Sequence, residues 1–251
     1  MIQRLTLISL LIFFSLPLSA QNDGLYDYKK EFLWGINTNS HSWFLGGVSA
    51  KFSTAISERK FKTLGFELLY LRNPLEFKRQ GQGGTTNNGV GRYVPNKLNH
   101  LYVIRANMGR DLLLFKKASH QGVMVNYNVS LGPSIGLLAP YYVRVNQPIG
   151  DNREQTVKLS DPGVGSSNII RAAPFKGIFE SKVLAGIHIK SSFLLEFGAY
   201  KKNLSGVELG FSSEIFSERP ELMNFGEGEN APKNKLWFNS VYLTIFYGNR
   251  K

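Results

Sequence analysis

Residues 123–132 read VMVNYNVSLG, and this stretch alternates between two kinds of side chain. The odd-numbered positions carry Val, Val, Tyr, Val and Leu, whereas the even-numbered positions carry Met, Asn, Asn, Ser and Gly. Successive side chains of a β-strand point to opposite faces of a sheet, so a period of two over this length predicts a strand with one apolar face and one polar or small face. The stretch therefore indicates an all-β fold.

The same alternation recurs along the chain and predicts eight strands. They cover residues 30–38, 43–53, 61–72, 98–110, 121–145, 178–199, 206–217 and 235–248. Within 178–199, the run Lys190-Ser191-Ser192 could form a turn that divides the segment and raises the number to nine. The odd positions stay apolar through Phe193, Leu195 and Phe197, which favours one long strand.

Two prolines fall in or just beyond the predicted strand over 121–145, at Pro133 and Pro140. Proline has no backbone N–H to donate to a neighbouring strand. We therefore expect the strand to bend, to bulge or to leave the membrane at these positions.

Three long connectors point to a membrane barrel. They cover residues 73–97, 146–177 and 218–234 and are rich in Gly, Pro, Asn and charge. All three are odd-numbered connectors, so an up-and-down barrel places them at one end, as is typical of outer-membrane barrels. An open sheet edge would leave N–H and C=O groups unpaired in lipid. The predicted fold is a closed antiparallel up-and-down transmembrane β-barrel of about eight strands, with long extracellular loops and short periplasmic turns.

The first twenty residues predict export. Arg4 precedes an apolar run over residues 5–16, and Pro17-Leu18-Ser19-Ala20 supplies small residues for cleavage, as in a secretory signal peptide. A transmembrane helix would need about twenty apolar residues, more than this run provides. We expect residues 1–20 to be a cleaved signal peptide and 21–251 to be an outer-membrane β-barrel domain.

Nine polar side chains on the strands are expected to point into the barrel. They are Glu67, Arg105, Asn107, Asn126, Asn128, His188, Lys190, Glu196 and Glu208. The interior of an eight-stranded barrel is just filled by side chains. We expect a buried network of acids, bases and amides that holds the barrel, rather than a catalytic or conducting site, because half-satisfied buried charges are costly.

Aromatic residues lie near the predicted strand ends, where their rings would meet lipid headgroups. They are Trp34, Trp43, Tyr70, Tyr102, Tyr141, Tyr142, Trp237 and Tyr247. The main alternative is a secreted, soluble lipocalin-like barrel that binds a small apolar ligand and places its apolar face inside. The positions of the long loops, the charges on the small-residue face and the aromatic strand ends favour the membrane barrel.

The signal peptide, the eight alternating segments and the aromatic final strand, WFNSVYLTIFY at 237–247, together resemble small outer-membrane β-barrel proteins of the OmpA-like or PorT-like type of Bacteroidota. The resemblance covers the whole mature chain and is architectural, without a specific motif. It implies insertion by the barrel-assembly machinery and residence in the outer membrane. The resemblance indicates the location of the protein better than its activity, because members of such families include anchors, adhesins, secretion accessories and a few enzymes.

The charge balance suggests lipid partners. The chain has 30 Lys and Arg against 18 Asp and Glu, a net charge of +12. These bases are spread over loops and the tail rather than gathered on one face, so we expect no nucleic-acid partner. Phosphates of lipopolysaccharide and phospholipid are the simpler partner. A protein partner bound through the long outer loops is the other expectation.

No catalytic site emerges from the sequence. The chain has no Cys and only four His, which excludes sites built on thiolates, and the His residues are scattered. Outer-membrane hydrolases that trim lipid acyl chains carry a His-x-Ser pair on a strand. No His in this sequence has a Ser two positions later. We expect a non-enzymatic structural or accessory barrel with no cofactor and no metal. A lipid-modifying enzyme that uses His188 or His100 is the second alternative.

Overall fold

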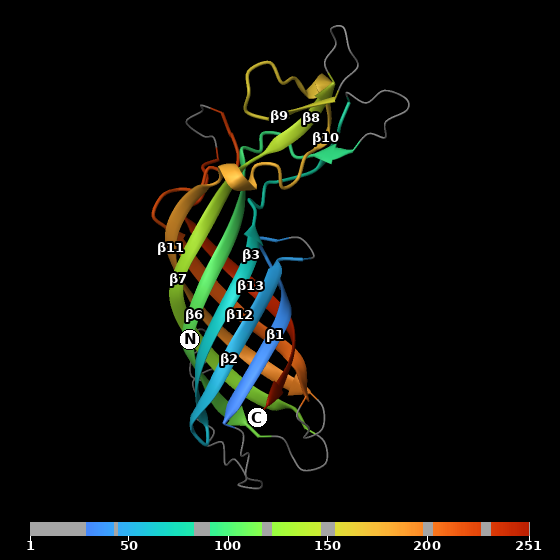
Figure 1. The fold of residues 1–251 in the computed structure, drawn as a ribbon. Coiled ribbons are helices and arrows are strands. Elements are labelled where there is room, and N and C mark those ends of the chain that lie inside the picture. Colours follow the sequence, from blue (N-terminus) through green and yellow to red (C-terminus); the bar gives the residue numbers. More distant parts are fainter. Residues whose placement is uncertain are drawn as a thin grey trace, which may run out of the picture.

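The computed structural model describes residues 29–42, 45–82, 91–116, 122–146, 154–197, 203–226 and 232–250, and its main body is a closed barrel of antiparallel strands (Figure 1). The barrel strands are β1 (Lys30–Asn39), β2 (Gly47–Ser57), β3 (Lys60–Leu71), β6 (Asn99–Phe115), β7 (Met124–Pro140), β11 (Lys182–Phe197), β12 (Asn203–Phe216) and β13 (Trp237–Arg250). Their order around the barrel is β1-β13-β12-β11-β7-β6-β3-β2, which confirms the predicted closed eight-stranded fold. Each strand pairs with its neighbour in sequence, and β1 closes the barrel against β13.

The strand at 178–199 is undivided. β11 continues through Lys190, Ser191 and Ser192 and keeps one register with β7 and with β12 over its whole pairing. The two serines follow the alternation of the strand, so they cause no turn. The prediction of one long strand is therefore confirmed.

The two prolines behave differently from each other. The bend or bulge expected at Pro133 is wrong, because Arg105 lies opposite Ser134 and Met108 opposite Leu131 in the same register on both sides of it. The pairing of β7 with β11 is continuous through Pro133. This pairing keeps the strand in place although the proline has no backbone N–H to donate. At Pro140 the barrel strand β7 ends, and the chain continues into a strand of another sheet that begins at Tyr142. The predicted strand over 121–145 is therefore wrong in its last residues, which belong to another sheet.

A second body stands on the end of the barrel that carries the three long connectors (Figure 1). We call it the loop module. It consists of β8 (Tyr142–Asn146), β9 (Glu154–Lys158) and β10 (Ile169–Ala172) in one sheet, and of β4 (Arg79–Gln80) and β5 (Arg92–Tyr93) in a hairpin. Two short 3-10 helices, η1 (Ser166–Asn168) and η2 (Ile178–Glu180), complete it. The connectors at 73–97 and 146–177 thus contain strands that the sequence analysis did not predict.

The loop module has its own core and is joined to the barrel by backbone hydrogen bonds. Val143, Ile169 and Tyr93 are buried together in it. The N–H of Tyr141 donates to the carbonyl of Leu98, one residue before β6 begins, at 2.8 Å. The third long connector packs on the mouth of the barrel, where Lys97 and Met223 form an isolated β-bridge. No helix among the described residues is long and apolar enough to cross a membrane.

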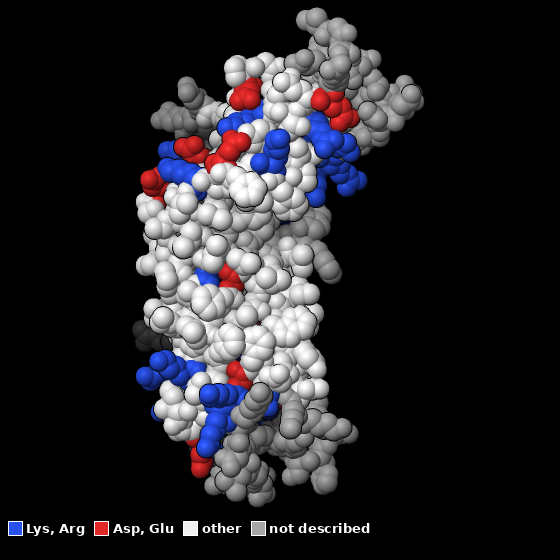
Figure 2. Space-filling model, viewed as in Figure 1, with Lys and Arg blue, Asp and Glu red and all other residues white. Residues whose placement is uncertain are grey.

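Most barrel strands bury every second residue, and the charged side chains of the wall's central part lie on the buried face. β13 shows this most simply, because it alternates between exposed and buried residues from Trp237 to Asn249. The outward face is apolar, and exposed members include Ile36, Val48, Phe66, Leu68, Leu131, Ile187, Ile189, Leu209, Phe211, Val241 and Ile245. In Figure 2 the charged residues gather at the two ends of the molecule and leave a largely uncharged band between them. This arrangement is the reverse of a soluble barrel with an apolar interior.

Candidate functional site

Arg105 is the centre of an ion-pair network inside the barrel. It lies on the inward face of β6, and its side chain reaches across the interior to Glu214 on β12. Its Nε lies 3.1 Å from Glu214 Oε1 and its NH2 2.7 Å from Glu214 Oε2, so the pair is bidentate. Its NH1 lies 3.4 Å from Glu67 Oε2 on the neighbouring strand β3. One guanidinium thus neutralises carboxylates from two strands.

Lys190 extends the network toward β12 and β13. Its ammonium donates to Glu67 and lies 3.9 Å from Glu208 Oε1, and it sits 4.4 Å from the centre of the Tyr242 ring. Glu208 also accepts hydrogen bonds from Tyr242 Oη at 2.6 Å and Ser192 Oγ at 2.8 Å. These contacts satisfy several lone pairs of a carboxylate that has little access to water.

His188 links β11 to β6 and β7 through neutral partners. Its Nε2 lies 2.5 Å from Asn107 Oδ1, and its Nδ1 lies 2.8 Å from Ser134 Oγ. With Asn107 as the acceptor, Nε2 carries the proton and Nδ1 accepts from the serine. A Ser–His–amide order is also found in acyl-transfer enzymes. Here, however, Ser134 is 2% exposed and His188 4% exposed, so no substrate reaches the hydroxyl.

A second group of charges lies toward the end of the barrel opposite the loop module. Arg250 on β13 pairs with Glu196 on β11 and lies 3.8 Å from Glu31 on β1. Lys51 on β2 lies 3.1 Å from Asp111 on β6, and Asp111 also accepts from Asn128 Nδ2. The interior charges are therefore paired in two groups along the barrel.

The structure places all nine residues expected in the interior on the inward face and brings eight of them into these contacts. The exception is Asn126, which is buried and whose Oδ1 has no hydrogen-bond partner among the described residues. Sequence reasoning missed Glu31, Lys51, Asp111, Glu214 and Arg250. Glu214 shares the parity of Glu208 on one strand, so counting by two from Glu208 would have found it. Asp111 lay just beyond the predicted strand end at residue 110.

The described side chains around the central ion pairs leave little free space. A cavity of about 30 Å³ lies between Lys51, Glu67, Asn107 and Lys190, which is room for about one water molecule. Apolar side chains fill the interior on both sides of the charges. Leu71, Leu101 and Phe238 cluster at the loop end together with Leu222 of the third connector, and Leu33, Leu194 and Phe246 cluster at the other end. The described interior is a packed core rather than a channel.

The aromatic residues expected at the headgroups fall into two groups. Trp34, Trp237 and Tyr247 are exposed on the outer wall. Trp237 begins β13 and Tyr247 lies near its end, whereas Trp34 lies in the middle of β1. Trp34 packs edge-on against Tyr247 with ring centres 6.1 Å apart. Tyr70 and Tyr102 also lie on the outer wall, at the loop end, with ring centres 5.3 Å apart. Trp43 lies outside the described residues.

Tyr141 and Tyr142 do not face outward, and their expected position is wrong. Tyr141 is 3% exposed and belongs to the core of the loop module, where its hydroxyl accepts the Val94 N–H at 3.0 Å. Burial raises the pKa of Tyr141 to about 12. Tyr142 Oη donates to Glu180 in the same module, at 2.8 Å from Oε1. Both residues follow the end of β7, so the inward–outward alternation of the barrel wall no longer sets the direction of their side chains.

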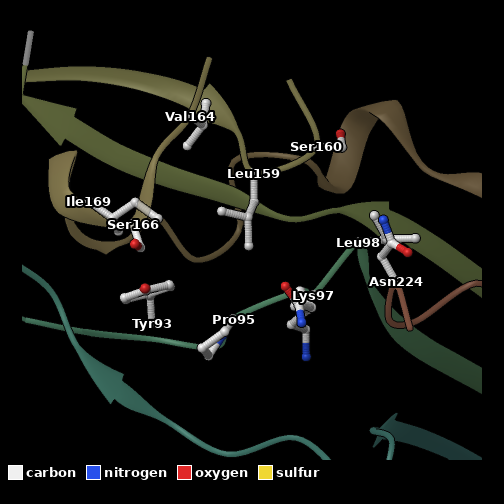
Figure 3. A pocket seen from close by; sticks show the side chains of 11 residues that line it. Tyr93, Pro95, Lys97, Leu98, Leu159, Ser160, Val164, Ser166, Ile169 and Asn224 are labelled. Atoms are coloured by element: carbon white, nitrogen blue, oxygen red, sulfur yellow. The ribbon is translucent and has the colours of Figure 1, made fainter. Parts of the chain in front are cut away.

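Two cavities adjoin the loop module, and Lys97 lies between them. The smaller, of about 280 Å³, lies within the module beside Tyr93, Leu159 and Ile169 (Figure 3). Figure 3 shows the Lys97 side chain directed away from Leu159. Its ammonium lies 2.5 Å from Glu76 Oε2 and 2.9 Å from Tyr70 Oη, in the wall of the larger cavity. Burial lowers the pKa of Lys97.

Metal-binding clusters are absent from the part of the chain that the structure describes, where no three His, Asp or Glu side chains converge as ligands. No protein-family model and no curated protein matches the sequence. Solved structures similar to this chain include Neisserial surface protein A (NspA), at a TM-score of 0.40 and 6% identity over 91% of this chain and 100% of that one. They also include Ail, the attachment invasion locus protein of Yersinia pestis, at a TM-score of 0.38 and 8% identity over 89% of this chain and 99% of that one. Because these TM-scores lie below 0.5, the fold is defined by the strand pairing described above.

Proposed function

We propose that this chain is an integral outer-membrane β-barrel protein without enzymatic activity, which acts as a structural or accessory component and presents its loop module outside the cell. The observation that carries this proposal is the orientation of the barrel wall. Apolar side chains such as Leu131, Ile187 and Ile245 face outward and are more than half exposed, whereas Glu67, Arg105 and Lys190 face inward and are paired.

The outward apolar belt is stable only next to lipid. Fully burying one Leu, Ile, Val or Phe side chain is worth about 1.5–3 kcal/mol. Leaving the whole belt in water would forgo free energy comparable to the total stability of a typical domain, about 5–15 kcal/mol. A closed barrel has no unpaired strand edge, which is the condition for spanning a bilayer with strands. A soluble lipocalin-like barrel would need the opposite arrangement of faces, so we do not retain that alternative.

The packed interior supports a structural role over a porin-like one. The charges are paired across the barrel, and apolar clusters fill the interior on both sides of them. Water-filled porins use sixteen or more strands to leave an aqueous channel. The same packing argues against the lipid-modifying alternative, because the Ser134–His188 pair is enclosed.

The partners follow from this position in the membrane. The outer wall would contact the acyl chains of outer-membrane lipids, and the basic residues at both ends would meet lipopolysaccharide and phospholipid headgroups. The chain would depend on the barrel-assembly machinery for insertion. The loop module could present a surface to a protein partner outside the cell. The signal peptide over residues 1–20 lies outside the described residues and remains part of the proposal.

Fractionation combined with heat modifiability tests this proposal. The native protein is expected in the outer-membrane fraction, and its unboiled form is expected to migrate differently from the boiled form on a detergent gel, because a closed barrel resists the detergent. Reconstituted in a planar bilayer, the protein is expected to show no steady conductance. Recovery in the soluble periplasmic fraction with no migration shift would contradict the proposal, and a steady open current would contradict the structural role.

A further inference from the structure

A large cavity lies on the outside of the barrel, beneath the loop module. It has a volume of about 770 Å³, which is within the range of small-molecule sites. Its barrel side is formed by Tyr70, His100 and Tyr102, which point outward from the loop ends of β3 and β6. Its other side is formed by the loop module, through Arg92 and Tyr93 of β5 and the segment that follows β10. The cavity is therefore at the height where the apolar belt ends.

The charge of this cavity is strongly positive. Among the described residues, Arg72, Lys78, Arg92 and Lys97 line it, against a single acid, Glu76. Glu76 is buried and is neutralised by Lys97, whose ammonium lies 2.5 Å from its Oε2. Four bases and one acid give the described lining of the cavity a net positive charge. An anion is the complementary ligand.

His100 belongs to a hydrogen-bond chain in the wall of this cavity. The Lys97 ammonium can only donate, so Tyr70 Oη accepts from it and donates its own proton to His100 Nδ1, 2.8 Å away. The proton of the neutral imidazole is then on Nε2. This atom is buried and has no hydrogen-bond partner among the residues that the structure describes. Because this atom is enclosed, the ligand contacts that the cavity offers come from its basic side chains rather than from His100 Nε2.

An apolar groove continues from the cavity toward the membrane belt. It has a volume of about 320 Å³ and shares Tyr70 and Tyr102 with the cavity. Leu68, Ile104 and Leu137 line it, and Leu68 lies opposite Ile104 directly below the Tyr70–Tyr102 pair. The order from the loop end to the belt is therefore basic cavity, tyrosine pair, apolar groove.

We infer that the cavity and the groove together form a binding site for a phosphorylated lipid of the outer leaflet. The phosphate lies among Arg72, Lys78 and Arg92. An acyl chain lies over Leu68, Ile104 and Leu137. This inference rests on the proposed function, because the groove faces acyl chains only if the barrel spans the membrane.

A lipid fits these observations better than a free phosphate ion does. The bases alone would attract either ligand. The groove adds apolar surface directly beneath the basic cavity, on the side of the belt, and only a ligand with an apolar chain gains free energy by covering it. The ligand therefore has its charge toward the loop end and its chain toward the belt, as lipids in a leaflet do.

Native mass spectrometry of the full mature protein in detergent micelles tests the inference with three probes. These are dioleoyl phosphatidic acid, dioleoylglycerol, which has the same chains without phosphate, and inorganic phosphate. We expect one phosphatidic acid molecule to be retained, and retention of the other two probes to be at least tenfold weaker. Equal retention of dioleoylglycerol would overturn the role of the bases. Full competition by inorganic phosphate at equal concentration would overturn the assignment to a lipid.

Variants separate the headgroup contacts from the chain contacts. The triple change Arg72→Gln, Lys78→Gln and Arg92→Gln is expected to lower retention of phosphatidic acid at least tenfold. Ile104→Ser is expected to weaken the retention of phosphatidic acid and to leave that of inorganic phosphate unchanged. If the triple variant does not fold, Arg92→Gln alone, on the exposed hairpin, carries the test.

A matched control removes the same charge elsewhere. Arg59, Lys60 and Lys62 are exposed at the opposite end of the barrel, and their change to Gln is expected to leave retention unchanged. If retention of phosphatidic acid falls equally in this control, the inference is overturned, because non-specific electrostatic attraction between the basic protein and the phosphate would then explain the binding. Each variant is first checked for the migration shift of the unboiled form. A wild-type chain that shows the shift but retains no phosphatidic acid overturns the inference alone, whereas a chain without the shift overturns the proposed function.

Discussion

Arg105 and Glu214 are joined by a bidentate ion pair across the barrel interior, although 109 positions separate them in the sequence. Two strands, β7 and β11, lie between their own strands on that side of the barrel wall. The pair therefore fixes the distance between non-neighbouring strands, which backbone hydrogen bonds do not do.

Replacing Arg105 with Met is expected to lower the free energy of unfolding by about 3–5 kcal/mol, because it leaves the buried carboxylates of Glu214 and Glu67 without their shared partner. The measurement is a urea titration in lipid vesicles followed by tryptophan fluorescence. Arg110→Met, on the outward face of the same strand, serves as the control and is expected to change little. Adding Glu214→Met to Arg105→Met should recover part of the loss. A double variant less stable than Arg105→Met would contradict this account of the pair.

A charge placed on the outer wall is expected to be destabilising in proportion to its depth in the membrane. Ile189 and Val183 both face outward on β11, with Ile189 near the middle of the strand and Val183 near its loop end. Ile189→Arg should lower the free energy of unfolding in vesicles by about 2–4 kcal/mol and Val183→Arg by about 0–1 kcal/mol. Equal losses at the two positions would argue against a membrane-spanning wall.

Gly132 is expected to tolerate no side chain. It points inward on β7, and a Cβ atom there would lie 1.8 Å from the carbonyl oxygen of Ala106 on β6. Gly132→Ala must therefore push two hydrogen-bonded strands apart, and we expect a reduced yield of the fast-migrating unboiled form. Gly165→Ala in the loop module would place its Cβ 3.6 Å from Ser167 Oγ, an ordinary contact. This second variant should fold as the wild type does, and a matching loss of yield would contradict the steric explanation.

The loop module contains an acid, Glu180, whose pKa should depend on its contacts with Lys158 and Tyr142. Lys158 Nζ lies 3.0 Å from Glu180 Oε2, and this contact, with the hydrogen bonds from Tyr142, lowers the pKa of Glu180 below its ordinary value of 4.5. The contribution of this carboxylate to stability is thus present above pH 4.5 and lost as the pH falls through the lowered pKa. A carbon-13 NMR titration of the Glu180 carboxyl should show the lowered value. Lys158→Met should move it upward, whereas Lys62→Met, at the far end of the barrel, should not.

The alternation of residues 123–132 and its repeats predicted the barrel strands, because a wall with lipid outside and charges inside forces a period of two on every strand. The inward position of Arg105 and Lys190 followed from the same parity. Glu31 and Arg250, which pair in the structure, could not be found this way, since each lies at the end of its strand where few neighbours define the parity.

The loop module was not predictable from the pattern. Its strands are two to five residues long, too short for a period to be recognised. Its core of Tyr93, Val143 and Ile169 forms only when segments from two connectors meet. The basic cavity could not be predicted either. Arg72, Lys78 and Arg92 are ordinary loop residues in the sequence, and only the return of β5 over the outer wall brings them beside His100.

The seam between β1 and β13 has a consequence for how the chain can be divided. β13 pairs with β1 on one side, from Glu31 opposite Arg250 to Asn39 opposite Tyr242, and with β12 on the other. A fragment that ends before Trp237 would therefore expose two unpaired edges that face each other across a slot one strand wide. A peptide of residues 237–250 fits this slot in a single register, because a shift by one residue would turn Ile245 into the interior and Phe246 toward lipid. The barrel thus has the geometry of a receptor for its own last strand, which makes it divisible into two complementing pieces.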